Sequence, residues 1–211
     1  VLELLVYSES GAVSMSKMAM YGETGQITIT PTSTLSLELK RMMARIDVTV
    51  SASDFLLGNV YLMNPPTAGY IAPQWDTNGN MVSVPTGPNL PSDINKSLGV
   101  YGAFSFYQDQ YGITGQIYSP ESPAAVDPNG NDVNDPETRL NATCLIVEGT
   151  YDMNTYYYRV DFTYDGSGSS VKGAYMPLLR NHLYSIDITE VSGRGYRTIE
   201  EALYSYTTVS N

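Results

Sequence analysis

The sequence predicts an all-β fold, an antiparallel β-sandwich. Short segments in which apolar and polar residues alternate recur along the chain, as expected of strands with one buried face. A helical period of apolar residues is nearly absent. The segments are separated by long loops that hold many of the 12 prolines and 18 glycines among the 211 residues. Strands joined by such loops, without intervening helices, favour an antiparallel sandwich over an α/β fold.

Alternation predicts three strand segments in the first part of the chain. They are QITITPT (26–32), TLSLELKRMMARIDVTV (34–50) and NVYLMN (59–64). The long segment alternates twice, first at Leu35, Leu37 and Leu39 and again at Ile46, Val48 and Val50. VLELLVYSES (1–10) is compatible with a strand or a short helix, because a period cannot be read over so few residues.

The second part of the chain contains four more strand candidates. They are GAFSFYQDQ (102–110), CLIVEGTY (144–151), TYYYRVDFTYDG (155–166) and HLYSIDITEV (182–191). CLIVEGTY is a nearly continuous apolar run, which is typical of a central strand. Near the end, Thr198 followed by Glu200 and Glu201 predicts a capped short helical turn. DGSGSS (165–170) is predicted to be a hairpin tip.

Composition and charge exclude several classes of function. The chain has 22 acidic and 11 basic residues and a net charge of −11. A nucleic-acid-binding protein needs a basic surface to neutralise phosphates, so this class is excluded. Binding to an anionic membrane is disfavoured for the same reason, and no apolar stretch has the length of a membrane span. With 42% apolar residues, the chain can bury a core of one large or two small domains.

Two reactive side chains, His182 and Cys144, are expected to be structural. A nucleophilic site needs a base placed beside a nucleophile, and the chain has one histidine and one cysteine, far apart in sequence. A zinc site usually needs more than one such ligand. His182 is therefore expected to fix the turn before the last strand, and Cys144 to be a small core residue. We therefore expect that the protein is not an enzyme, that it binds no cofactor and that it has no catalytic residue.

Two loops offer weaker candidates for binding. Within DPNGNDVND (127–135), oxygen ligands from Asp127 to Asp135 could hold calcium. Pro128 and the lack of a glutamate at the required spacing favour a solvated turn instead, so no metal site is predicted. Trp75, in a proline-rich loop, could stack on a sugar or clamp the surface. Three glutamates are available for glycosidase chemistry, but nothing singles out two of them: Glu121, Glu148 and Glu190.

Several segments, read in order, resemble the fimbrillin family, the type V pilins and Mfa-like proteins of Bacteroides-type bacteria. They are MAMYGETGQITI (18–29), LELKRMMARIDVTV (37–50), FLLGNVYLMNPP (55–66), TGQIYSPES (114–122), YYYRVDFTYDG (156–166), LLRNHLYSIDITEVSGRGY (178–196) and EEALYSYTTVSN (200–211). No single motif is very specific, but their order and spacing together are. Residues 178–196 look like the family's penultimate scaffolding strand.

The resemblance implies two transthyretin-like sandwich domains in a fimbrial subunit. Residues 1–44 would be the remnant of an N-terminal domain, and residues 45–211 a C-terminal domain that lacks its terminal donor strand. Such subunits are made as lipoproteins, exported to the cell surface and cut after a basic residue, which removes the first strand. A strand from a neighbouring subunit then fills the apolar groove. The implied partners are other pilin subunits, in a homo- or heteropolymer, and a host or bacterial surface receptor.

An alternative remains open for the function. A surface-displayed sandwich, such as a pilus tip, could bind carbohydrate or protein through the loops 64–98 and 119–138. The resemblance does not distinguish a shaft, an anchor or a tip subunit.

Overall fold

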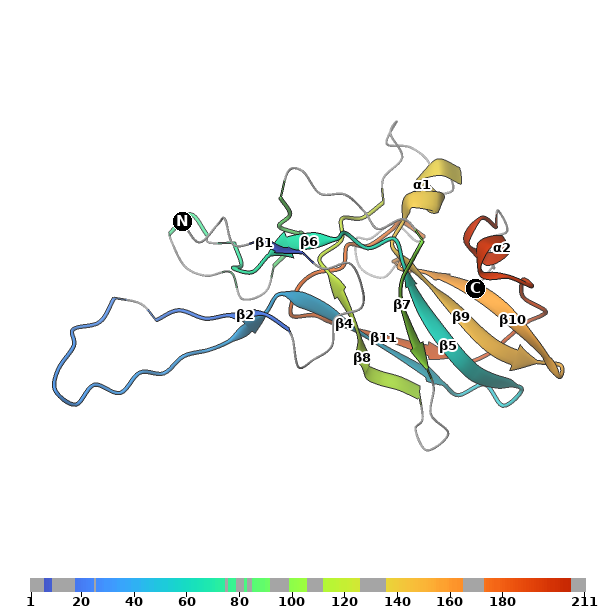
Figure 1. The fold of residues 1–211 in the computed structure, drawn as a ribbon, viewed down its shortest axis with the longest axis horizontal. Coiled ribbons are helices and arrows are strands. Elements are labelled where there is room, and N and C mark those ends of the chain that lie inside the picture. Colours follow the sequence, from blue (N-terminus) through green and yellow to red (C-terminus); the bar gives the residue numbers. More distant parts are fainter. Residues whose placement is uncertain are drawn as a thin grey trace.

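The computed structural model describes residues 6–8, 18–24, 26–74, 76–78, 82, 85–91, 99–105, 112–125, 136–164 and 173–205. In this part of the chain two sheets pack face to face, and a long arm extends away from them (Figure 1). The predicted all-β sandwich is thereby confirmed. The hairpin tip predicted at 165–170 lies outside the described residues.

The first layer is a four-stranded antiparallel sheet in the order β10-β9-β5-β7. Its strands are β5 (Phe55–Met63), β7 (Val100–Ser105), β9 (Cys144–Tyr151) and β10 (Asn154–Asp161). All four overlap with predicted segments, since each alternates or is continuously apolar. β9 is continuously apolar because both of its faces are covered: Leu145 and Val147 face the core, while Cys144 and Ile146 pack under the short helix α2 (Ile199–Leu203).

The second layer has three strands in the order β11-β4-β8. They are β4 (Met43–Val50), β8 (Gly112–Pro120) and β11 (Leu183–Ile188). β8 is antiparallel to β4, but β11 is parallel to it, so the purely antiparallel prediction is wrong for this pair. Alternation reports which face of a strand is buried and carries no information about strand direction. The predicted division between residues 44 and 45 falls inside β4 and stays a prediction.

Two small sheets and a helix complete the described elements. The sheets pair β1 (Val6–Ser8) with β6 (Ala68–Tyr70), and β2 (Met20–Tyr21) with β3 (Lys40–Arg41). The helix α1 (Pro136–Asn141), which the sequence analysis missed, precedes β9. In the predicted turn near the end, Thr198 caps α2, and its Oγ1 accepts a hydrogen bond from the Glu201 backbone N–H at 3.1 Å.

The core lies between the two sheets. It is built from residues of the facing strands, together with Phe162 and Leu178 from the segment between β10 and β11: Ala44, Ile46, Val48, Phe55, Leu57, Val60, Leu62, Phe104, Ile113, Ile117, Leu145 and Val147. Burial of each large aliphatic or aromatic side chain contributes about 1.5–3 kcal/mol. The periodic pattern that predicted these strands is therefore the pattern that stabilises the sandwich.

Gly149 in β9 is the described glycine at which an added Cβ atom would lie nearest to another atom, and its replacement by alanine is expected to destabilise the protein. A Cβ atom there would lie 2.1 Å from Cζ of Phe55 and 2.7 Å from the Leu56 carbonyl oxygen. Overpacking of this kind costs about 1–3 kcal/mol. Urea denaturation of Gly149→Ala tests this, with Gly193→Ala as the control, because no atom lies within 4 Å of a Cβ at Gly193. Equal stability of the two variants would contradict the packing described here.

The arm consists of residues 22–24 and 26–39 and projects from the base formed by β2 and β3 (Figure 1). The sequence predicted strands at 26–32 and in the first half of 34–50. Residues 26–30 and 33–39 instead lie outside any ladder in the described part of the chain. Apolar and polar residues do alternate in these segments, which predicts that the apolar face is buried. No described part of the chain covers that face.

Candidate functional site

The outer edge of β11, here called the β11 edge (residues 183–188), is a row of backbone groups that pairs with no other described strand. On the inner side, the carbonyl oxygen of His182 accepts a hydrogen bond from the Arg45 N–H at 2.9 Å, and that of Ile188 accepts from Ser51 at 3.0 Å. Even-numbered residues therefore point their peptide groups toward β4. Because successive residues alternate, those of Leu183, Ser185 and Asp187 point outward. No other strand in the described part of the chain pairs with this edge.

The core also remains partly uncovered beside this strand. β8 and β11 are the two edge strands of the same sheet, yet the core-facing Ile113 and Ile117 of β8 are fully buried. The core-facing residues of β11 are only half-buried: Tyr184, Ile186 and Ile188. An unpaired edge with half-exposed core residues is a template for strand addition.

A buried ion pair fixes the turn that leads into β11. Arg180 is 3% exposed and Glu121, at the end of β8, is 1% exposed. Arg180 Nε donates to Glu121 Oε2 at 2.8 Å, and its Nη2 donates to the Tyr70 carbonyl oxygen at 2.8 Å. Its Nη1 donates to the Ile71 carbonyl oxygen at 3.2 Å. One side chain thus ties together the end of β8, the loop after β6 and the start of β11.

His182 takes part in the same turn. The preceding Asn181 has a φ of 60°, a left-handed conformation that asparagine tolerates better than most residues. The His182 Nδ1 atom lies 2.9 Å from the carbonyl oxygen of Arg180, a contact in which Nδ1 carries the hydrogen. With its backbone carbonyl bound to Arg45, His182 serves the geometry of the turn, as the sequence suggested.

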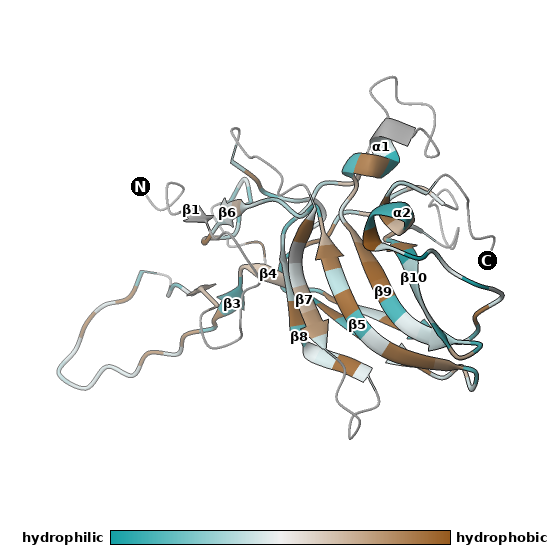
Figure 2. Ribbon diagram, turned by 45° about the vertical axis from the view of Figure 1, so that its right-hand side comes forward, coloured by the Kyte–Doolittle hydropathy of each residue, from teal (hydrophilic) through white to brown (hydrophobic). Residues whose placement is uncertain are grey.

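The arm exposes apolar side chains in alternation. Leu35, Leu37 and Leu39 are 58%, 54% and 55% exposed, and Ile27 and Ile29 are exposed as well. Figure 2 shows the hydrophobic colouring recurring along the arm, well away from the sandwich. An exposed set of large apolar residues at strand spacing is typical of an interaction surface. The arm and the β11 edge are two features of one chain that each lack a strand partner in the described residues.

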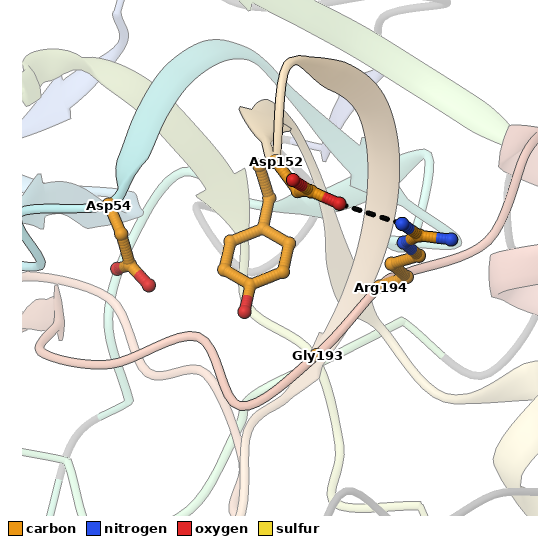
Figure 3. A pocket seen from close by; sticks show the side chains of 5 residues that line it. Asp54, Asp152, Gly193 and Arg194 are labelled. Atoms are coloured by element: carbon orange, nitrogen blue, oxygen red, sulfur yellow. Dashed lines mark hydrogen bonds and ion pairs between the residues drawn. The ribbon is translucent and has the colours of Figure 1, made fainter.

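A shallow pocket of about 430 Å³ lies at the end of the sandwich where three turns meet (Figure 3). Its lining residues are Asp54, Tyr151, Asp152, Gly193 and Arg194. Arg194 Nη2 donates to Asp152 Oδ2 at 2.7 Å, and this bond raises the pKa of Arg194. The pocket combines an aromatic ring, two carboxylates and a guanidinium, a set that can hydrogen-bond hydroxyl groups.

The structure does not bring the three candidate glutamates together as a catalytic pair. Glu121 is bound to Arg180 inside the protein. Glu148 lies on the outer face of the first sheet, where its Oε2 accepts from Tyr61 Oη at 2.6 Å and from Asn59 Nδ2 at 3.0 Å. Burial, followed by this contact, raises the pKa of Tyr61 to about 12. Glu190 is exposed in the segment after β11.

The remaining candidates divide between buried and undescribed residues. Cys144 is fully buried in β9, which confirms its expected place in a core. Trp75 and the loop 127–135 lie outside the described residues. Among the residues that are described, no group of three or more His, Cys, Asp or Glu side chains is placed to hold a metal ion.

Sequence reasoning missed Arg180 and the pocket. The sequence does contain an indication of the role of Arg180, which directly follows the apolar run Pro177-Leu178-Leu179. A charged residue that is buried with such a run is almost always paired. The pocket has no comparable signal, because its residues come from three turns that are distant in sequence.

Comparisons with known proteins add little to this geometry. No family model matches the sequence, and no curated protein matches it. The structure is similar to a crystal structure from Bacteroides uniformis, of a protein to which a role in cell adhesion has been provisionally ascribed. The TM-score is 0.40 and the identity 14%, over 88% of this chain and 61% of that one. The chain thus spans less than two thirds of that protein, and a similarity of this degree assigns neither a family nor a function.

Proposed function

We propose that this protein is a structural subunit of a cell-surface fimbria, which assembles by β-strand exchange and serves adhesion. The observation that carries the proposal is the β11 edge, where outward-facing backbone groups adjoin half-exposed core residues. A strand added there would form backbone hydrogen bonds and cover Tyr184, Ile186 and Ile188. The adhesive role and the location at the cell surface follow from the sequence resemblance.

The energetics of such a contact are favourable. Each hydrogen bond contributes a net of about 0.5–1.5 kcal/mol. Each apolar side chain that moves from water into the interface contributes about 25 cal/mol per Å² of area covered. The ordering of a flexible donor strand opposes these gains. When one copy donates and the next accepts, the contact is head-to-tail and can repeat without closing, which gives a filament.

The net charge of −11 is compatible with this role, because self-repulsion keeps free subunits soluble until a specific contact forms. No helix in the described part of the chain is both long and apolar enough to cross a membrane. The partners we propose are further copies or related pilin subunits, together with a surface receptor.

Electron microscopy and crosslinking of the full-length protein after protease treatment test the proposal. We expect filaments, and crosslinks between subunits that map to the β11 edge. If treated protein remains monomeric, with no crosslink between subunits at that strand, the proposal is wrong.

A second candidate, receptor binding by a tip subunit, is favoured by the pocket beside Arg194. If it holds, Arg194→Ala should lower binding to a glycan array by about tenfold, because one charge-assisted hydrogen bond is worth about 1.5–3 kcal/mol. Arg197→Ala is a matched control, since Arg197 is an exposed arginine that does not line the pocket. Equal glycan binding by both variants, or none by the wild type, would count against a glycan receptor at this site.

A further inference from the structure

We propose that the strand added at the β11 edge is the arm of a second copy, and specifically its leucine leg, residues 34–39. This inference rests on the proposed function and names the donor for its strand-exchange contact. The partner is thus another molecule of the same chain.

The leucine leg and the β11 edge match in length and in spacing. The leg spans six residues, as does β11 (Leu183–Ile188). It presents three large apolar side chains at every second position, more than half exposed: Leu35, Leu37 and Leu39. The strand it would join has three half-buried residues at the same period: Tyr184, Ile186 and Ile188. Residues spaced by two share one face of a strand, so pairing places both sets over the same core.

Both carboxylates near this contact already have partners within their own copy. In the leg, Glu38 forms an ion pair with Lys40. On β11, Asp187 accepts hydrogen bonds from Ser51 Oγ at 2.8 Å and from Thr49 Oγ1 at 3.2 Å. Like charges that face each other across strands are destabilising. The ion pair of Glu38 and the hydrogen bonds to Asp187 stabilise the two carboxylates within their own copies and so reduce the repulsion between them when the strands approach.

The arm cannot reach the β11 edge of its own copy. Its base is fixed by the pairing of Met20 with Arg41 and of Tyr21 with Lys40. The next residue, Met42, is buried against Met43 and Tyr118. From this base the arm extends away from the sandwich, whereas β4 and the parallel β11 run into it (Figure 1). A return to β11 would require a reversal at residues 40–42, which these contacts prevent, so the pairing must be between molecules.

Cysteine crosslinking of full-length protein tests the donor directly. One tagged sample carries Ser36→Cys on the leg, and a second, differently tagged sample carries Ser185→Cys on the outer face of β11. The native Cys144 is fully buried and does not compete. After protease treatment and mixing, a short thiol crosslinker should join the two tags. The control pairs Ser36→Cys with Met153→Cys, because Met153 is 93% exposed at the β9–β10 turn on the other sheet.

The inference predicts at least about tenfold more product for the leg–β11 pair than for the control pair, since only the former lies in the contact. Equal yields, or products that join one leg to another leg, would overturn it. A second measurement compares Leu37→Asp with Ile29→Asp, which alters the other leg. Because both side chains are exposed, neither change should lower the melting temperature, but only Leu37→Asp should abolish filaments.

The two proposals fail in different ways. Filaments that are lost on changing β11 but persist with Leu37→Asp would show that another strand is the donor, so the inference would fail and the proposed function would stand. Absence of filaments in the wild type would defeat both.

Discussion

Replacement of Arg180 by methionine is expected to lower the free energy of unfolding by about 3–5 kcal/mol, the usual cost of removing one partner of a buried ion pair. The carboxylate of Glu121, which is 1% exposed, would lose its guanidinium partner, and the Tyr70 and Ile71 carbonyl oxygens would lose their donor. Urea denaturation at neutral pH measures the change.

Two further variants make this prediction specific. Arg194→Met breaks the exposed pair with Asp152 and should cost less than about 1 kcal/mol, as is usual for surface ion pairs. Removing both charges, with Glu121→Gln added to Arg180→Met, should recover part of the loss because no unpaired charge remains. If Arg180→Met and Arg194→Met cost the same, Arg180 does not hold the turn before β11.

Proline at Ser185 is expected to abolish filament formation while leaving the subunit folded. The Ser185 N–H points away from β4, so proline removes no hydrogen bond within the sandwich but deletes a donor at the β11 edge. The proline ring also blocks close approach of another strand, which is why natural edge strands use it against aggregation. Electron microscopy of protease-treated protein measures filaments, and thermal denaturation measures folding.

Ser185→Ala is the matched control, because it changes the same side chain and keeps the N–H. It should form filaments like the wild type. Filaments of Ser185→Pro in normal number and length would show that assembly uses another surface. Loss of filaments in both variants would show that the Ser185 hydroxyl, rather than the backbone of the edge, is what matters.

The strands of the sandwich other than β8 (112–120), which the alternation did not indicate, were predictable because each buries at least one face within its own chain. The alternation at Ile46 and Val48 and the continuous run in β9 report burial directly. The same pattern at Leu35 and Leu37 also predicted a strand, but these residues do not form one in the described structure. Alternation indicates that one face of a strand becomes buried, but it does not indicate whether the same molecule or another one buries that face.

Other features could not have been predicted from local patterns. The parallel pairing of β11 with β4 depends on the path of the chain between them, over more than 130 residues. The ion pair of Arg180 with Glu121 joins residues that are far apart in sequence. The pocket lined by Asp54, Asp152 and Arg194 does so as well. Each requires knowledge of which turns and strand ends meet in space.

Amide hydrogen exchange along β11, measured on full-length protein before and after assembly, tests most directly whether this strand accepts a neighbour. We expect the N–H groups of Leu183, Ser185 and Asp187 to exchange quickly in the monomer and to become protected in the filament. Those of Tyr184 and Ile186, which face β4, should be protected in both states. Outward-facing amides that exchange equally fast in the filament, or that are already protected in the monomer, would contradict the account.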